Sequence, residues 1–244
     1  IILGGWEKAR LLPLLDIMVS DASEEALRTL KMQFPQIHTL PGGNREAAWG
    51  DVVFLAIHPP VAGEVLATVR PTIRDDAIVV SLMPKVTIAQ LCTLLGGFGR
   101  IVRMIPNAPS IIGQGYNPIT LSPDIWEEER ATLLSLFSPL GECPEVPEEH
   151  LEAYAVITAM GPPYLWFQMN EIVQIAREFG LSEKDARTGV GMMVQGVTRT
   201  MFSSGMKPEE VMDLVPVRPM GEDEQAIRDL YRSRLTALHA KLKG

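Results

Sequence analysis

In VVFLAIHPP, residues 52–60, an unbroken run of six apolar residues is followed by His58 and a pair of prolines. AIVVSL at residues 77–82 repeats the pattern, and both runs are hydrophobic at successive positions instead of at alternate ones. Continuous runs of this kind are typical of strands in a parallel sheet whose faces are both covered by helices. The sequence therefore predicts strands over these two runs, inside an α/β domain.

On both sides of these runs, apolar segments continue to alternate with amphipathic ones up to about residue 147. The remaining chain has the period of helices throughout, which predicts an all-helical domain over residues 148–244 after an α/β domain over residues 1–147. Helices of the first domain are expected from Glu24, after Asn44, after Pro60 and over 124–141. Further strands are expected at residues 16–21, 37–40, 99–107 and 117–122, with 143–147 as a candidate edge strand.

Composition narrows the classes of partner. Acidic residues outnumber basic ones by 30 to 22 in the 244 residues, giving a net charge of −8, and no cluster of Lys and Arg is present to follow a phosphate backbone. Nucleic acid is therefore not an expected partner. The longest apolar stretch, residues 154–167, is interrupted by Gly161 and the prolines after it and is shorter than the roughly 18 residues of a membrane span. We expect no membrane segment.

Cys92 and Cys143 lack the spacing of metal ligands, so they are expected to be ordinary thiols in a reducing cytoplasm, and no metal site is predicted. The segment from Tyr154 to Met169 is apolar nearly all round, which predicts burial on every side. A small helical domain cannot bury such a helix alone. We expect it to form an interface between two subunits, with packing against the α/β domain as the alternative.

In an open parallel sheet, ligands bind beyond the carboxyl ends of the strands. Ser20 and Asp21 follow one expected strand, where the adenosine ribose of a dinucleotide would lie. A carboxylate there accepts hydrogen bonds from ribose hydroxyls and repels a 2′-phosphate, so Asp21 favours NADH. The alternative is that Asp21 only caps the helix that follows.

The next strand ends carry further candidates. His58 and Pro59 form a stiff turn that suits the pyrophosphate or the nicotinamide ribose, and His58 is a candidate for proton transfer unless it is a solvated surface residue. Lys85 can pair with an anionic substrate, or can merely be solvated. Asn107 lies between prolines, where its amide suits a nicotinamide or an imine but is also ordinary in a turn.

Several stretches carry a resemblance to one family. RMIPNAPSIIGQGYNPIT at residues 103–120 resembles the Arg-Ala-Met-Pro-Asn-Thr-Pro segment of pyrroline-5-carboxylate reductases, and VVFLAIHPP resembles their Ala-Val-Lys-Pro turn. AMGPPYLWF at 159–167 is similar to their Gly-Pro-Ala-Tyr helix. GMKPEEVMDLV at 205–215 is similar to the stretch before their glycine-threonine motif. The resemblance extends over essentially the whole chain.

This resemblance implies an N-terminal Rossmann domain and a helical C-terminal domain that interlocks two subunits as a homodimer, or as a ring of such dimers. It also implies hydride transfer from NADPH or NADH to a cyclic imine, in proline biosynthesis, with Ala56 and Pro59 among the cofactor-binding residues. Residues 1–21 look like the family's first helix and second strand. The family's first strand and its glycine-rich turn are thus expected before Ile1.

The chain also departs from the family's pattern. The glycine-threonine loop, which holds the substrate carboxylate in the family, is replaced by PVRPMGEDE at residues 216–224, so Arg218 is a candidate carboxylate ligand unless it is solvated. Pro84 and Lys85 replace the family's Ala-Gly, and His58 replaces the lysine of its turn. Recognition of the substrate is therefore expected to differ.

In the mechanism that these residues suggest, the substrate binds against the helix that begins near Gly161. The backbone N–H groups of this helix and the Thr158 hydroxyl form hydrogen bonds with it. Thr158, His58 or a water delivers a proton to the imine nitrogen. Two other functions stay open. One is a non-catalytic dimeric homologue that still binds a nucleotide, and the other is an NADP oxidoreductase that acts on a deazaflavin cofactor.

Overall fold

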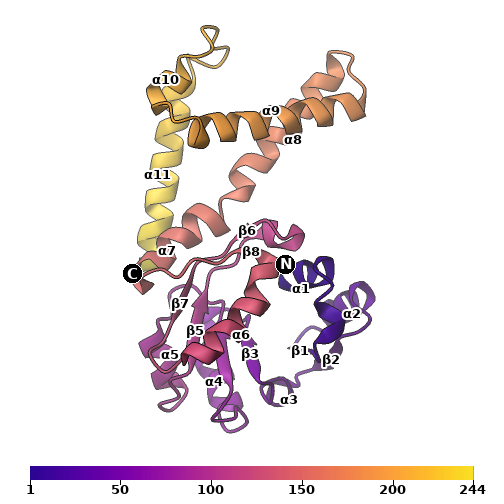
Figure 1. Ribbon diagram of the computed structural model, residues 1–244, viewed down its shortest axis with the longest axis vertical. Coiled ribbons are helices and arrows are strands. Elements are labelled where there is room, and N and C mark those ends of the chain that lie inside the picture. The colour runs from indigo at the N-terminus through magenta and orange to yellow at the C-terminus, as the bar shows by residue number, and fades with distance from the viewer. Residues whose placement is uncertain (244) are drawn as a thin grey trace. The chain divides into compact units, whose positions relative to one another are not determined.

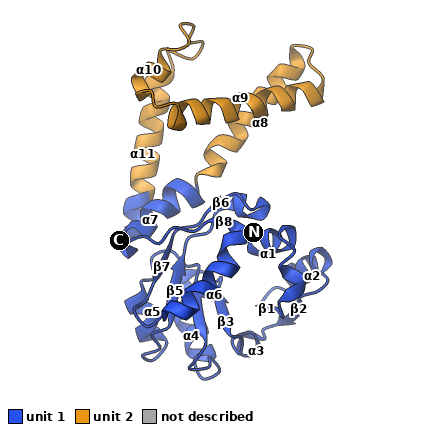
Figure 2. Cartoon of the chain, in the orientation of Figure 1, with its two compact units in different colours: residues 1–160, 239–244 blue, residues 161–238 orange. Residues whose placement is uncertain are grey.

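The computed structural model describes residues 1–243, which form two compact units (Figure 2). Unit 1 contains residues 1–160 and the C-terminal residues from His239 on, and unit 2 contains residues 161–238. An α/β part followed by an all-helical part confirms the predicted fold class. The strands are β1 (Met18–Asp21), β2 (His38–Pro41), β3 (Val52–Leu55), β4 (Ile78–Ser81), β5 (Ile101–Met104), β6 (Gly115–Tyr116), β7 (Ile119–Leu121) and β8 (Gly141–Glu142).

In unit 1, α1 precedes the first strand, α7 follows the last one and the other helices lie between strands, whereas the helices of unit 2 follow one another without strands (Figure 1). Those of unit 1 are α1 (Ile2–Lys8), α2 (Glu24–Gln33), α3 (Asn44–Ala47), α4 (Ala62–Val69), α5 (Ile88–Leu94), α6 (Glu127–Phe137) and α7 (Leu151–Tyr154). The others are α8 (Pro162–Glu178), α9 (Glu183–Ser203), α10 (Pro208–Met212) and α11 (Glu224–Lys243), whose last residues belong to unit 1.

The main sheet has the order β3-β4-β5-β7, in which the first three strands are parallel and β7 is antiparallel to β5 (Figure 1). β1 and β2 form a separate parallel pair, and β6 pairs with β8. The expected edge strand at 143–147 is reduced to one bridge between Ile119 and Glu145. The parallel strands expected from VVFLAI and AIVVSL are confirmed.

The apolar side chains of the main sheet divide between its two faces, because successive residues of a strand point in opposite directions. Val53, Val79 and Ile101 pack on one face with side chains of α4 and α5. Val80 and Val102 pack on the other with side chains of α1 and α6. Every residue of β4 and β5 is buried, which is the arrangement that continuous hydrophobic runs predict.

Unit 1 continues past residue 147, where the sequence predicts the end of the α/β domain, as far as Met160. Residues 148–160 pack with the α/β part, because Glu148 and Glu152 form ion pairs with the buried Arg103 of β5. The helical segment that the sequence predicts from residue 148 on is interrupted. It comprises α7, a π-helical turn over Ala155–Ala159, and α8, which begins after Gly161.

The interruption has a local cause. Pro162 and Pro163 occupy the first positions of α8 and have no N–H with which to continue the preceding helical hydrogen bonds. Before the break, Ala155 and Val156 are buried in unit 1, as the alternative of packing against the α/β domain predicts. After the break, large apolar side chains of unit 2 are exposed in the single chain, among them Trp166 at 52% and Phe167 at 67%.

Candidate active site

The carboxyl ends of β3, β4 and β5 bring three of the predicted segments to one edge of the main sheet. Because these strands are parallel and in register, the residues after each of them leave the sheet on the same side. His58 follows β3, Lys85 follows β4 and Asn107 follows β5. These three residues therefore lie at the same edge of the main sheet, as their positions after parallel strands predict.

Asn107 joins this edge to the π-helical turn that carries Thr158. Its side-chain Nδ2 donates to the Thr158 carbonyl at 3.4 Å, and its Oδ1 accepts from the backbone N–H of Tyr116 at 3.1 Å. The backbone N–H of Asn107 donates to Asn117 Oδ1 at 3.0 Å. The 7% exposed Asn107 is thus held in one orientation, with one amide hydrogen left for a ligand.

Thr158 lies in a π-helical turn, a form of backbone that is frequent at functional sites. Its hydroxyl donates to the carbonyl of Tyr154 at 2.8 Å. Since that bond uses its only hydrogen, the oxygen of Thr158 is left to accept a hydrogen bond. In this conformation Thr158 suits an N–H of a substrate better than it suits proton delivery.

The segment over residues 151–159 is also attached to the turn after β4. Glu152 Oε1 accepts from the backbone N–H of Lys85 at 3.1 Å. Lys85 has φ 72°, in the left-handed region that costs a residue with a side chain about 1–2 kcal/mol. This is the position at which the family's pattern has glycine.

Arg103 of β5 supplies the positive charge that holds the segment over residues 151–159 against the sheet. Its side chain is 1% exposed and reaches Glu152 Oε1 at 2.7 Å and Glu148 Oε1 at 3.0 Å. Burial tends to raise the pKa of Glu152, but the hydrogen bond and charge of Arg103 outweigh it, so that this pKa is lowered. Glu148 Oε1 also accepts from the N–H of Ile88 at the start of α5.

The roles of Arg103, Glu148 and Glu152 were not predicted from the sequence. One signal was available, because Arg103 interrupts the apolar run of a strand that was expected to be covered on both faces. A buried guanidinium requires carboxylate partners, and acidic residues occur at EEHLE, residues 148–152. Which of the 30 acidic side chains would reach it is decided only by the tertiary fold.

Ser20 and Asp21 end β1, in the separate two-stranded sheet. The Ser20 hydroxyl donates to Asn44 Oδ1 at 2.7 Å, and Asp21 Oδ1 accepts from the backbone N–H of Ser23 at 2.7 Å. The cap of α2 is Ser23, whose side chain accepts from Ala26 N–H, so Asp21 shapes the turn before the cap instead of capping the helix itself. Its exposed carboxylate keeps an oxygen for a ligand.

The turn after β3 is open to solvent. Ala56 and His58 are exposed, and a single 3-10 turn over Pro59–Val61 follows them. Within residues 1–243, the His58 imidazole forms no hydrogen bond or ion pair, while its carbonyl accepts from the N–H of Val61 at 3.1 Å. His58 is accordingly accessible to a ligand or to water.

Gly161 and Arg218 belong to unit 2. Tyr164, the first residue of α8 with an N–H, donates it to the carbonyl of Gly161 at 2.9 Å. The row of N–H groups expected at the start of this helix is therefore shortened by Pro162 and Pro163. The Arg218 guanidinium forms an ion pair with Asp213 and donates to the carbonyl of Met212 at 3.2 Å.

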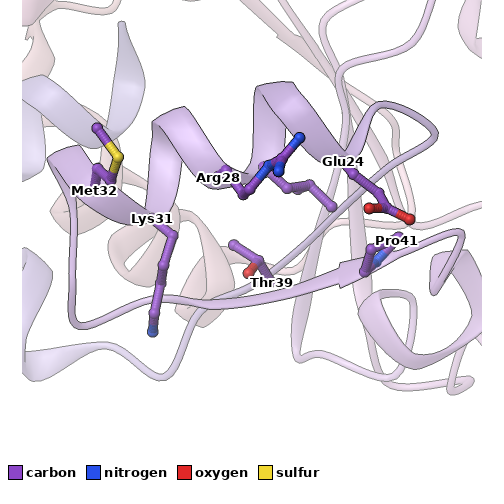
Figure 3. Close-up of a pocket in the computed structure, with 7 residues that line it drawn as sticks. Glu24, Arg28, Lys31, Met32, Thr39 and Pro41 are labelled. Carbon is purple, nitrogen blue, oxygen red and sulfur yellow. The ribbon is translucent and has the colours of Figure 1, made fainter.

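A groove of about 340 Å³ lies outside these strand ends, between α2 and β2 (Figure 3). None of the predicted site residues lines it. In Figure 3 the side chains of Arg28 and Lys31 extend from α2, and Thr39 and Pro41 come from β2. The lining residues are Glu24, Leu27, Arg28, Lys31, Met32, Thr39 and Pro41.

Two other predictions concern absences. Among the described residues, no group of His, Cys, Asp and Glu side chains is arranged to hold a metal ion. Across residues 1–243, no helix has the length and apolar character needed to cross a membrane.

Burial raises the pKa of the Cys143 thiol to about 11, so this thiol stays protonated at neutral pH and is a poor nucleophile.

Two family models match different parts of the chain. Residues 148–242 match the model described as pyrroline-5-carboxylate reductase dimerisation. Residues 8–85 match the model described as NADP oxidoreductase, coenzyme F420-dependent. The first match covers the helical part, and the second covers the α/β part from β1 to β4, including α2, α3 and α4.

Curated relatives and solved structures agree with these matches. The pyrroline-5-carboxylate reductase of Escherichia coli (strain K12) is 26% identical over 214 residues, which are 88% of this chain and 79% of that protein. That of Pseudomonas aeruginosa is 24% identical over 238 residues, 97% of this chain and 86% of the relative.

The structure of a pyrroline-5-carboxylate reductase from Coxiella burnetii is similar with a TM-score of 0.72 and 25% identity, covering 99% of this chain and 92% of that one. The Plasmodium falciparum pyrroline carboxylate reductase with NADP bound has a TM-score of 0.82 at 18% identity, with the same coverage. At that identity the likeness concerns the fold.

Proposed function

Because the chain belongs to the pyrroline-5-carboxylate reductase family, we propose that it uses NADPH or NADH to reduce the C=N bond of pyrroline-5-carboxylate, as in proline biosynthesis. The observation that carries this proposal is the edge of the main sheet at which β3, β4 and β5 end on the same side, and at which Asn107, after β5, donates to the carbonyl of Thr158. This edge is where parallel α/β sheets bind nucleotides and their substrates.

The polar groups at the strand ends fit a dinucleotide at both of its ends. The exposed carboxylate of Asp21 can accept hydrogen bonds from a ribose diol, and the remaining amide hydrogen of Asn107 can donate to a carboxamide. Ala56, His58 and Pro59 would lie along the middle of the cofactor. When bound there, the reduced nicotinamide supplies the hydride that converts the C=N carbon to a CH group.

The chain's own residues then orient the imine and supply a proton to its nitrogen. Thr158 accepts an N–H of the protonated imine through its hydroxyl oxygen, since its hydrogen is used by Tyr154. His58 is accessible, so it or a water that it binds delivers the proton when the imine enters unprotonated. The carbon gains the hydride and the nitrogen gains the proton, which leaves a secondary amine.

We further propose that the protein is a cytoplasmic homodimer, which can associate further into a ring of dimers. The match of residues 148–242 to a dimerisation model and the exposed apolar side chains of α8 and α9 support the dimer. The partner subunit would cover these side chains, as the apolar sequence of this region requires.

An NADP oxidoreductase that acts on a deazaflavin is the second candidate, because the model matched by residues 8–85 is described as coenzyme F420-dependent. That match is confined to the half of the chain that would hold the dinucleotide. A non-catalytic homologue is the third, because PVRPMGEDE replaces the family's glycine-threonine loop.

An absorbance assay that measures oxidation of NADPH and NADH by the full chain distinguishes these candidate functions. The proposal predicts oxidation that depends on pyrroline-5-carboxylate. Oxidation only when a deazaflavin is the acceptor would favour the second candidate. Measurable cofactor binding without turnover of any cyclic imine would favour the third.

A further inference from the structure

Lys85 has a backbone conformation that its own side chain does not explain. Its φ of 72° lies in the left-handed region, which glycine adopts without strain and lysine does not. The side chain is exposed, and within the described part of the chain it forms no hydrogen bond or ion pair. Strained positions of this kind that persist at a strand end are often functional.

The backbone of Lys85 is held from outside its own turn. Its N–H donates to Glu152 Oε1 at 3.1 Å, and the same oxygen accepts from Arg103 Nη2 at 2.7 Å. Since Arg103 is buried and paired with Glu148 as well, the acceptor for Lys85 is fixed in place. The fold therefore maintains a lysine, with a free ammonium group, in a conformation that favours glycine.

The position of Lys85 in the sheet indicates which part of a ligand it meets. β4 lies between β3 and β5, and Ser81 of β4 is in register with Arg103 of β5. The turn after β4 is thus next to the one that carries Asn107, proposed to bind the nicotinamide. It is not next to Asp21, which ends β1 in the other sheet.

The other candidate for binding the substrate carboxylate is already engaged. Arg218 forms an ion pair with Asp213 and donates to the carbonyl of Met212, both within unit 2. A carboxylate ligand would have to compete with Asp213 for this guanidinium. Lys85 has no such competitor among residues 1–243.

We propose that Lys85 binds the carboxylate of the substrate, and that Glu152, fixed by Arg103, is the positioning residue that holds the Lys85 backbone for this contact. The inference rests on the proposed function, because it takes the substrate to be a cyclic imine with a carboxylate. It assigns to the turn after β4 the part that the family's glycine-threonine loop plays in its members.

The test compares two ligands of nearly the same shape, one with a negatively charged carboxylate and the other with a neutral amide. Calorimetry with saturating NADP⁺ measures binding of cyclopentanecarboxylate and of cyclopentanecarboxamide. We expect the unmodified protein to prefer the carboxylate, Lys85→Met to lose about tenfold of that preference, and Lys85→Arg to keep most of it. Lys184→Met, which removes an exposed lysine of α9, is the matched control and should keep the full preference.

Lys85→Gly separates the side chain from the backbone. Glycine relieves the strain of a positive φ, so this variant should unfold at a higher temperature than the unmodified protein and yet lose the carboxylate preference. Full preference in both Lys85→Met and Lys85→Gly would overturn the proposal. Weaker NADP⁺ binding with an intact carboxylate preference would also overturn it, in favour of a cofactor phosphate.

The proposed function can fail separately from this inference. A carboxylate preference that depends on Lys85, in a protein that does not oxidise NADPH with pyrroline-5-carboxylate, would leave the inference standing and remove the function. Turnover with an unchanged KM for pyrroline-5-carboxylate in Lys85→Met would support the proposed function and contradict the inference about Lys85.

Discussion

At the scale of single residues, the feature that most constrains the candidate site is the charge of Arg103 inside unit 1. Removing a guanidinium from water costs several kcal/mol, and carboxylate partners must offset this cost. Glu148 and Glu152 are those partners, and they come from the segment that continues to Thr158. One buried charge thereby links the sheet to the residues proposed to hold the substrate.

Arg103→Met should lower the free energy of unfolding by about 3–5 kcal/mol, because it leaves two carboxylates without their cation in a mostly buried place. Urea denaturation followed by circular dichroism measures this. Arg74→Met is the control, since Arg74 pairs with Asp51 and Asp76 at the surface, and it should change stability little. A loss in Arg103→Met no larger than in the control would contradict the account.

Asp21 is the residue expected to set the preference of the protein for NADH over NADPH. Asp21→Ser should raise the affinity for NADPH relative to NADH, because it removes a negative charge from the place proposed for the 2′-phosphate. Calorimetric titration of both cofactors gives the ratio. If the ratio stays unchanged, Asp21 serves only to accept the N–H of Ser23 in the turn before α2.

At the scale of elements, the segment over residues 151–159 is fastened to the sheet at two places. Glu152 accepts from Lys85 and Arg103 near one end, and the Thr158 carbonyl accepts from Asn107 near the other. The backbone between these places includes the π-helical turn. These two sets of hydrogen bonds together hold Thr158 in position next to the carboxyl end of β5.

Glu152→Gln tests the first attachment through its pH dependence. The lowered pKa of Glu152 means that its charge adds stability fully above its ordinary pKa of 4.5, and that this stability is lost as the pH falls through the lowered pKa. At neutral pH the variant should be less stable by about 1–3 kcal/mol. The difference should be smaller at an acidic pH well below 4.5, because the Glu152 carboxylate is protonated there. A difference that is the same at both pH values would show that the charge is not involved.

The elements themselves were largely predictable from the sequence. β3 and β4 follow from unbroken apolar runs, and α2 follows from Ser23 before Glu24 and Glu25, because these signals are local. The interruption between α7 and α8 was not predicted, although Pro162 and Pro163 were visible. Prolines are tolerated in the first turn of a helix, so they mark either a start or a kink, and neighbouring contacts decide between them.

At the scale of the whole molecule, unit 2 exposes more apolar surface than a stable monomer usually does. Phe167, Met192 and Phe202 are 67%, 64% and 82% exposed in the single chain. The sequence predicted an interface from the apolar helix, but its partner surface depends on a second copy and therefore cannot be read from one chain. For the same reason, the roles of Gly161 and Arg218 remain predictions.

Sedimentation at micromolar concentration should give the mass of a dimer. Phe167→Asp should shift the protein toward the monomer, because a charge would have to be buried in the apolar interface. Met32→Asp provides the control, since Met32 is 81% exposed in α2 of unit 1, and it should leave the dimer intact. A monomer in the unmodified protein would contradict the proposed interface.

In the reaction that we propose for the whole molecule, a hydride passes from a reduced nicotinamide to the C=N carbon of pyrroline-5-carboxylate. The most direct measurement uses NADPH that carries deuterium at the transferred position and analyses the product by mass spectrometry and NMR. We expect proline with one deuterium on the ring carbon that had formed the C=N bond. Proline without deuterium, or no proline from a protein that binds both ligands, would contradict it.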